Sequence, residues 1–286
     1  MKLLVVGASG LVGWNLLKVA RDSGHQAIGT YASHPLSGLS ELQLGNTEAI
    51  THLLETFQPE VVICCTAWSW VDGCQGDPKR AFLENAERPS HLGRLAFQHG
   101  ARFLYFSTSY VFDGKEGPYD ENAPTNPISI YGESKLQGER LVLEATEGRA
   151  LIARTMGVYG EEPQQKNFVY QVVRNLRAGK SMNIPSDQRG NASHVMDLAS
   201  MSLSLLEKKM SGVWNVAGPE PALSRKDFAL RIAREYGLDS TLFHFLPTSD
   251  LGQPAPRPLN GGLIIDRAVS LTHHAPSPWR AIPMTK

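Results

Sequence analysis

Three side chains in the middle of the sequence have the types and the spacing of a proton-transfer site. Tyr131 and Lys135 are four residues apart in a segment rich in helix formers, so both lie on one face of the predicted helix, one turn apart. A phenol with a pKa near ~10 transfers protons poorly at neutral pH, and a nearby ammonium lowers that pKa. Thr108 ends an apolar run predicted as a buried strand, and its hydroxyl can hydrogen-bond the same substrate oxygen. We predict Thr108, Tyr131 and Lys135 as catalytic residues; the alternative is an ordinary amphipathic helix.

The glycine-rich segment 7–13 predicts a dinucleotide-binding site. The apolar run 2–6 leads into a G-x-x-G-x-x-G pattern, and an amphipathic helix pattern follows. Backbone N–H groups and the helix dipole at such a turn favour a pyrophosphate. The predicted cofactor contacts in this turn are Gly7, Gly10, Leu11, Val12 and Gly13.

The end of the second predicted strand, at 26–30, bears on the choice between NAD and NADP. NAD-specific proteins carry an acidic residue there for the ribose hydroxyls, whereas this sequence continues with Tyr31, Ala32, Ser33 and His34. Without a carboxylate a 2′-phosphate is not repelled, and Ser33 and His34 can contact it; alternatively, they only form a polar loop. We predict NADP(H) in preference to NAD(H), with Tyr31, Ser33 and His34 beside the cofactor.

Strand and helix patterns alternate along the first half of the chain. Further apolar runs at 61–65, 102–106 and 151–154 are separated by helical patterns, which predicts an α/β fold with a doubly wound parallel sheet. Ligands bind at the carboxyl ends of such strands. The predicted cofactor contacts at these ends are Cys65, Thr66, Ala67 and Phe106.

After Gly157 the sequence becomes richer in Pro, Gly and polar clusters. Helices are predicted at 167–178 and 195–208, and Ser224 is a predicted cap of a third helix that Gly237 ends. The segment 68–76 and the Pro-rich segment 254–260 are predicted as loops, the second lying over a site.

Composition argues against several classes of protein. The 286 residues carry 28 basic and 28 acidic side chains, for a formal net charge of +0, so neither nucleic acid nor an anionic membrane is an expected partner. No apolar run approaches the ~20 residues of a membrane span, and we expect a cytoplasmic protein. The three cysteines, Cys64, Cys65 and Cys74, have no disulfide or zinc spacing, and His273 and His274 lack a partner cluster, so no metal is predicted and the histidines are taken as surface residues.

Together the motifs resemble those of the extended short-chain dehydrogenase/reductases. Within them the chain is similar to the dTDP-4-dehydrorhamnose reductase group and to its relative, the regulatory β subunit of methionine adenosyltransferase. The motifs that carry the resemblance are the N-terminal glycines, Ser107-Thr108, 110–114, Tyr131-Gly132, Ser134-Lys135, Asp187-Gln188, Asp197-Leu198-Ala199 and Arg257-Pro258 with Asn260.

The resemblance implies a Rossmann domain interleaved with a smaller substrate domain. We expect the first at 1–157 with a return segment at about 188–217, and the second at 158–187 and 218–286. The implied substrate contacts are Ser109, Tyr110, Asn167, Gln188 and Arg257. Departures from the pattern are Ser109 in place of Asp, Gly157 in place of Trp and Gln43 in place of an Asp beside the adenine, and they predict a sugar other than that of dTDP-4-dehydrorhamnose.

Three functions follow as expectations. The first is an NAD(P)H-dependent reductase of a nucleotide-linked 4-keto-deoxysugar, able to form a homodimer. The second is a sugar-nucleotide epimerase or dehydratase, but a dehydratase would carry an Asp-Glu pair after Thr108, where this chain has Ser109-Tyr110. The third is a nucleotide-binding regulatory subunit without turnover.

Overall fold

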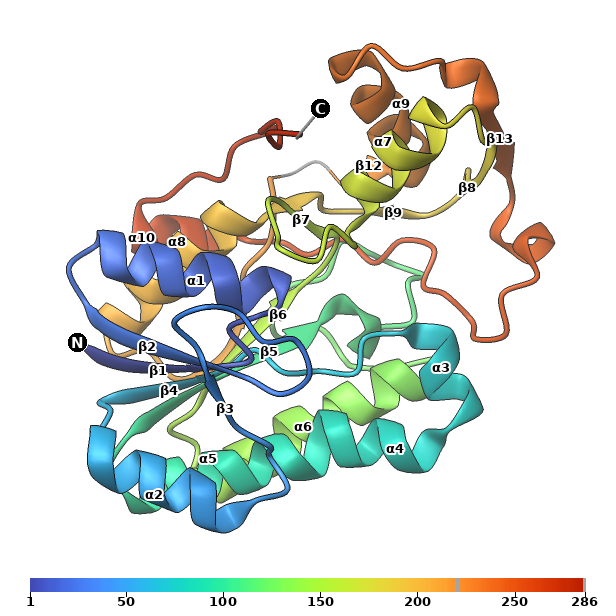
Figure 1. Ribbon diagram of the computed structural model, residues 1–286. Helices are drawn as coiled ribbons and strands as arrows, with labels where there is room; N and C mark the ends of the chain where they lie inside the picture. Colours follow the sequence, from blue (N-terminus) through green and yellow to red (C-terminus); the bar gives the residue numbers. More distant parts are fainter. Residues whose placement is uncertain (220–221, 285–286) are drawn as a thin grey trace.

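A seven-stranded parallel sheet forms the centre of the protein. The computed structural model describes residues 1–219 and 222–284. The strand order is β11-β6-β5-β4-β1-β2-β3, so the chain runs outward from β1 and then returns to β4 on its other side (Figure 1). The strands are β1 (Lys2–Val6), β2 (Gln26–Tyr31), β3 (Ser40–Glu41), β4 (Val61–Cys64), β5 (Arg102–Thr108), β6 (Leu151–Thr155) and β11 (Gly212–Asn215). The predicted doubly wound sheet is confirmed.

Helices cover both faces of this sheet, which explains why its strands read as continuous apolar runs. Alternate residues of β1 face opposite layers: Leu3 and Val5 belong to one apolar core, and Leu4 and Val6 to the other. The first layer contains α1 (Leu11–Asp22), α8 (Val195–Glu207) and α10 (Asp266–Thr272), and the second contains α2 (Thr47–Phe57), α5 (Arg88–Gln98) and α6 (Ile130–Ala145) (Figure 1).

The loop predicted for 68–76 is wrong in its second half. Residues 71–76 form a short helix, α3 (Val71–Gly76), and α4 (Pro78–Phe82) and a π-helical turn, η1 (Leu83–Glu87), lead directly into α5. Asp77 caps α4 by accepting from the N–H of Arg80 at 3.1 Å, and Pro78 follows at the first helical position. This Asp-Pro pair marks the start of the helical segment after residue 76, whereas α3 begins after Trp70 without a side-chain cap.

A smaller unit stands at the carboxyl edge of the sheet and has its own apolar core. It contains α7 (Phe168–Arg177), α9 (Arg225–Glu235) and the pair β8 (Met182–Pro185) and β13 (Phe243–Leu246), visible at the upper right of Figure 1. Two further short sheets pair β7 (Val158–Tyr159) with β10 (Ser193–His194), and β9 (Arg189–Gly190) with β12 (Leu223–Ser224). The remaining short elements are η2 (Ser109–Val111), η3 (Ser240–Leu242) and η4 (Thr248–Leu251).

The chain returns to the large sheet between these elements, since α8 and β11 both belong to it. We propose the division into 1–157 with 188–217, and 158–187 with 218–286, of which 220–221 and 285–286 lie outside the described residues. One part of the second range departs from this scheme, because α10 packs against α8 on the large sheet.

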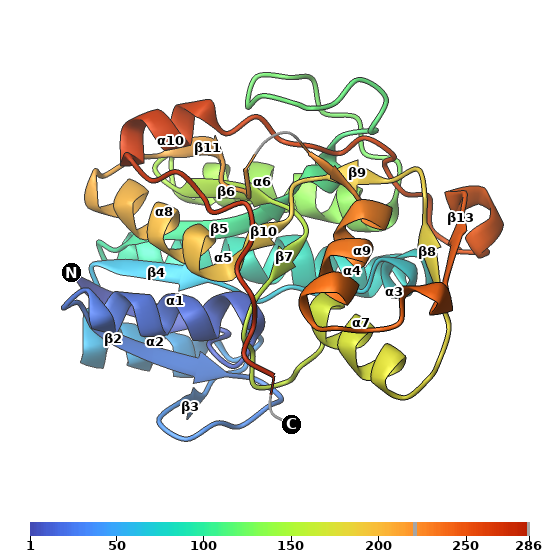
Figure 2. The same ribbon diagram turned by 90° about the horizontal axis from the view of Figure 1, so that it is seen from above.

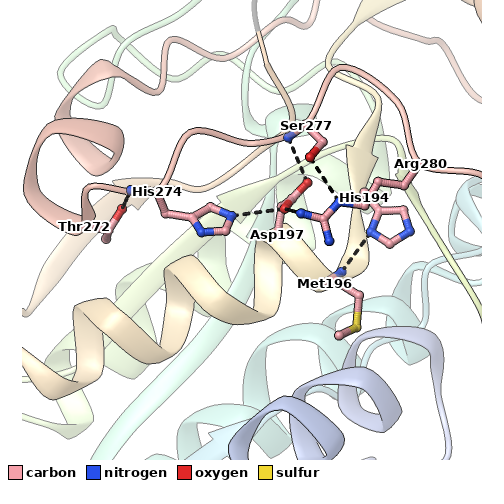
Figure 3. Close-up of polar contacts among 7 residues, drawn as sticks. All are labelled: His194, Met196, Asp197, Thr272, His274, Ser277 and Arg280. Atoms are coloured by element: carbon pink, nitrogen blue, oxygen red, sulfur yellow. Dashed lines mark hydrogen bonds and ion pairs between the residues drawn. The ribbon is translucent and has the colours of Figure 1, made fainter. Parts of the chain in front are cut away.

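The segment after α10 crosses back over α8 (Figure 2) and is fastened by a buried carboxylate. Asp197, 1% exposed, accepts hydrogen bonds from His274 Nε2 at 3.0 Å, Arg280 at 2.7 Å and the N–H of Ser277 at 3.0 Å (Figure 3). The prediction that His274 is a surface residue without a partner is wrong, because its partner is 77 residues away in the sequence.

No helix among the described residues is both long enough and apolar enough to span a bilayer.

Candidate active site

The end of β5 and the first turn of α6 bring Thr108 and Tyr131 together. Ser129 caps α6 by accepting from the N–H of Gly132 at 3.2 Å, which places Tyr131 in the first turn. The Thr108 side chain lies near enough to Tyr131 to lower the pKa of its phenol, and the Thr108 hydroxyl accepts from the N–H of Tyr110 at 3.2 Å. The ring of Tyr110 stands edge-on to that of Tyr131, with centroids 5.4 Å apart. A hydroxyl pair suited to proton transfer therefore stands at the carboxyl edge of the sheet.

Lys135 lies one turn further along α6, but its ammonium has a different partner. Its Nζ donates to the carbonyl oxygen of Phe106 at 2.7 Å and lies 3.9 Å from the centroid of the Tyr105 ring. Burial raises the pKa of Tyr131, and the hydrogen bond from Thr108 opposes this with a smaller effect. Burial also lowers the pKa of Lys135 to about 8. The prediction that Lys135 lowers the pKa of Tyr131 is therefore wrong for this structure, because burial decides the direction.

A buried ion pair fixes α6 against the two strands beside it. Arg154 on β6 donates through Nε and Nη2 to the two carboxylate oxygens of Glu139 on α6, at 2.9 and 2.7 Å. Ser107 Oγ on β5 donates to the same carboxylate at 2.5 Å. The bidentate geometry gives a rigid connection between elements that carry Thr108 and Tyr131. No local pattern in the sequence links Arg154 to Glu139, 15 residues away.

The glycine turn joins β1 to α1 and leaves room in front of the helix. A Cβ on Gly13 would lie 2.4 Å from the carbonyl oxygen of Gly7, so only glycine allows α1 to start this close to the turn. At Gly10 the nearest atom would be 3.6 Å away. Of the predicted contacts, Gly7, Gly10, Leu11, Val12 and Gly13 lie along this turn, and Cys65, Thr66 and Ala67 lie beside it after β4.

The loop before α7, which belongs to the smaller unit, contacts the glycine turn between β1 and α1. Asn15 Nδ2 donates to the carbonyl of Glu161 at 2.7 Å, and Gln164 Nε2 donates to the carbonyl of Ser9 at 3.0 Å, so the loop is docked on the glycine turn. Lys166 Nζ then lies 3.5 Å from His34 Nε2, and His34 Nδ1 lies 2.9 Å from Ser33 Oγ. Tyr31 ends the strand before them. Ser33 and His34 are predicted cofactor contacts, whereas no local pattern predicts the contact of His34 with Lys166, 132 positions away.

The structure gives three of the predicted substrate contacts different surroundings. Ser109 is fully buried, and its Oγ has no hydrogen-bond partner within 1–219 and 222–284. Gln188 Nε2 donates to Thr248 Oγ1 at 3.1 Å. Arg257 forms an ion pair of 2.9 Å with Asp72 on α3, which anchors the loop 254–260.

The remaining predicted substrate contact, Asn167, does not fit that role. Its Nδ2 donates to the carbonyl of Gly160 at 2.8 Å and to Glu162 Oε1 at 2.9 Å, and its Oδ1 accepts from the N–H of Val169 at 3.2 Å. Both amide hydrogens and the capping oxygen are thus used to start α7. The side chain is a helix cap, as its position immediately before an apolar helical pattern could have indicated.

The glycine at 157 is a requirement of the backbone. Its φ is +56°, and a Cβ there would lie 2.3 Å from the carbonyl oxygen of Asn191. An aromatic side chain at this position would therefore need a different path of the chain. The neighbouring Met156 instead packs on Gly190, where a Cβ would lie 2.0 Å from its methyl carbon.

Comparisons with known proteins agree with this architecture. A family model described as the RmlD substrate binding domain matches residues 1–283. The probable low-salt glycan biosynthesis reductase Agl14 of Haloferax volcanii is 34% identical over 265 residues, 90% of this chain and 88% of the relative. The methionine adenosyltransferase 2 subunit beta of Rattus norvegicus is 31% identical over 289 residues, 98% and 85% of the two chains. The solved dTDP-4-dehydrorhamnose reductase from Bacillus anthracis in complex with NADP superposes with a TM-score of 0.87 at 25% identity, covering 97% of this chain and 96% of that one.

Proposed function

This chain belongs to the family of the RmlD substrate binding domain, and on that premise we propose that it is an NADPH-dependent reductase of a nucleotide-linked keto-sugar. The observation that carries the proposal is the Thr108–Tyr131 hydroxyl pair at the carboxyl end of β5. The glycine turn after β1 opens at the same edge of the sheet. A proton donor and a dinucleotide site at one sheet edge are what reduction of a carbonyl requires.

The residues around the glycine turn fit a dinucleotide. The open space at Gly10 and the N–H groups at the start of α1 suit a pyrophosphate. We propose Phe106, Tyr31 and the residues after β4 as further walls of this site, and Lys135 as the group that holds the nicotinamide ribose. When bound, the nicotinamide supplies the hydride for the reduction.

Tyr131 supplies the proton in this proposal. Burial raises its pKa, so the phenol is protonated at neutral pH and can donate to the keto oxygen as the carbonyl becomes an alcohol. The Thr108 side chain lowers the pKa of Tyr131, which is the effect expected of a hydroxyl that donates to the phenolate left after the transfer. Tyr131 is therefore already protonated when the keto-sugar binds, as its role as the acid requires.

The preference for NADP(H) over NAD(H) rests on three exposed side chains, Ser33 and His34 after β2 and Lys166 in the loop before α7. The His34 ring lies 2.9 Å from Ser33 Oγ and 3.5 Å from Lys166 Nζ. A lysine and a histidine beside a hydroxyl are suited to a 2′-phosphate, which the adenosine ribose of NADPH carries and that of NADH lacks.

The substrate is proposed to contact Ser109, Tyr110 and Gln188 below the loop that Arg257 anchors. Ser109 Oγ is a buried hydroxyl without a partner in the described chain, which is costly unless a ligand supplies one. Because serine replaces a carboxylate there and Gly157 leaves no side chain, we propose a nucleotide-linked 4-keto-sugar other than dTDP-4-dehydrorhamnose.

The test follows NADPH oxidation with a panel of nucleotide-linked 4-keto-sugars that includes dTDP-4-dehydrorhamnose. We expect turnover with at least one panel member and poorer turnover with dTDP-4-dehydrorhamnose. Efficient reduction of the latter would refute the proposed substrate difference, and a Tyr131→Phe variant as active as the unmodified protein would refute the proposed acid.

The similarity to the methionine adenosyltransferase 2 subunit beta favours one second candidate. In that case the chain would bind NADPH and regulate a partner without turnover. The intact Thr108–Tyr131 pair supports catalysis over this alternative. NADPH binding without oxidation across the whole panel would favour the regulatory role.

The proposal also includes a cytoplasmic location and a homodimer. Trp70, 66% exposed beside α3, is the side chain most suited to a contact between copies. Light scattering of the purified protein tests the dimer, and a monomer at micromolar concentration would contradict it.

A further inference from the structure

Arg225 carries a positive charge without a counter-charge near the candidate active site. It is the first residue of α9, and its guanidinium carbon lies 3.5 Å from the centroid of the Phe168 ring on α7. Its side chain is half-buried and has neither a hydrogen bond nor an ion pair with any residue of 1–219 and 222–284. Desolvation of an unpaired cation is unfavourable, so the chain maintains this arrangement at a cost.

The acidic group nearest in sequence is committed elsewhere. Asp227 Oδ2 accepts from Ser224 Oγ at 2.6 Å, and Ser224 Oγ accepts from the N–H of Asp227 at 3.0 Å, so the two residues form the cap of α9. Arg257, by contrast, is paired with Asp72 at 2.9 Å. Of these two arginines, therefore, Arg225 is the one without a carboxylate partner in the described part of the chain, 1–219 and 222–284.

The position of Arg225 connects it to the catalytic pair through Tyr110. Tyr110 stands edge-on to Tyr131, 5.4 Å between centroids, and the charges of Arg257 and Arg225 both act on its hydroxyl to lower a pKa that burial raises. The N–H of Arg225 donates to the carbonyl of Gln188 at 2.8 Å. The backbone of Arg225 is thus fixed beside Gln188, and its charge is near enough to act on Tyr110, so Arg225 stands next to two of the proposed substrate contacts.

We propose that Arg225 binds the diphosphate of the nucleotide-linked substrate. This assignment rests on the proposed function and deepens it by naming the residue that recognises the anionic part of the substrate. A guanidinium that stacks on Phe168 through its face leaves its N–H edges free, and those edges match two phosphate oxygens at once. A diphosphate would also supply the negative charge that no carboxylate within 1–219 and 222–284 provides through an ion pair with Arg225.

A purely structural role makes a different prediction. If Arg225 only packs α9 against α7 through Phe168, its removal lowers stability and leaves nucleotide affinity unchanged. Lys226 offers a matched control, because it is the next residue of α9, is exposed, and lies 5.0 Å from the centroid of another phenylalanine ring, that of Phe245.

The experiment measures binding of UDP, dTDP and GDP by calorimetry to the full chain saturated with NADP⁺. For whichever nucleoside diphosphate binds the unmodified protein, we expect Arg225→Ala to weaken binding at least tenfold, the loss of one charge-assisted contact. Arg225→Lys should recover part of the loss, because it keeps the charge without the fork. Lys226→Ala should bind like the unmodified protein, and all variants should bind NADP⁺ with unchanged affinity, which also reports folding.

The outcomes separate the two proposals. Unchanged nucleoside diphosphate affinity in Arg225→Ala refutes the role of Arg225 and leaves the reductase proposal standing. A loss of NADP⁺ affinity in a folded Arg225→Ala variant also refutes it, because the residue would then belong to the cofactor site. If the unmodified protein binds NADP⁺ and none of the three nucleoside diphosphates, the proposed substrate class fails and this inference fails with it.

Discussion

Replacing Lys135 by methionine should change how the stability of the cofactor-free protein depends on pH. The ammonium is 1% exposed, and its pKa is lowered from 10.5 to about 8 because burial penalises the charged form. The folded protein therefore binds fewer protons than the unfolded chain between these two values. The stability associated with this group is fully present above the unfolded pKa and is lost as pH falls through about 8.

The magnitude follows from the size of the shift. Each pKa unit corresponds to about 1.4 kcal/mol, so the protonated lysine destabilises the fold by about 3 kcal/mol below pH 8, relative to its neutral form. About 2–3 kcal/mol of this should be recovered between pH 7 and pH 10. In Lys135→Met the apolar side chain has no proton to lose. The difference in unfolding free energy between the two proteins should therefore move by about 2–3 kcal/mol in favour of the unmodified chain over this range.

Urea unfolding of the cofactor-free proteins at pH 7, 8, 9 and 10 measures this difference. Lys79→Met is the matched control, because Lys79 is exposed on α4 and water solvates it in both states, so its difference from the unmodified chain should stay flat. The contrary result is a Lys135→Met difference in unfolding free energy that is as independent of pH as the Lys79→Met difference, or that moves in the opposite direction. Either outcome would refute the claim that burial beside the Tyr105 ring penalises the charged form of Lys135.

Four further results are expected. Tyr131→Phe should lower kcat by roughly 10²–10⁴-fold in the NADPH-oxidation assay and leave NADPH affinity nearly intact, and normal turnover would exclude it as the acid. Gly10→Val should abolish binding of both NADPH and NADH in calorimetry while the melting temperature changes little, since the structure leaves room for the side chain only where the pyrophosphate would lie; retained binding would contradict the proposed turn. Lys166→Ala should weaken NADPH roughly 10-fold and leave NADH unchanged, and an equal effect on both would exclude a 2′-phosphate contact. Asp197→Ala should lower the unfolding free energy by about 2–3 kcal/mol in urea, because it leaves His274 and Arg280 without their carboxylate; an unchanged midpoint would show that the C-terminal segment does not depend on this contact.

The sequence alone was sufficient for the features that depend on neighbouring residues. The buried strand before Gly7 and the helix after it follow from apolar periodicity and glycine spacing, and both are local. The positions of Thr108 at the end of a strand and Tyr131 at the start of a helix follow in the same way. A parallel sheet then brings strand ends to one edge, so local patterns were enough to predict the architecture.

The tertiary structure decided what those residues contact. The helical spacing of Tyr131 and Lys135 suggested a direct electrostatic effect of one on the other. In the fold, however, Lys135 binds the carbonyl of Phe106, and burial sets the pKa of Tyr131. Burial is a property of every element packed around a group, and a spacing of four residues carries no information about it.

The same reason explains the residues that sequence reasoning missed. Lys166 reaches His34 across 132 positions, Asp72 pairs with Arg257 across 185 positions, and Arg225 meets Phe168 only because α9 packs against α7. Each contact joins segments whose separation in the sequence is far longer than any helical or strand period. Local propensity determines the elements, but only their packing determines which charges are paired, which are buried, and which remain free for a ligand.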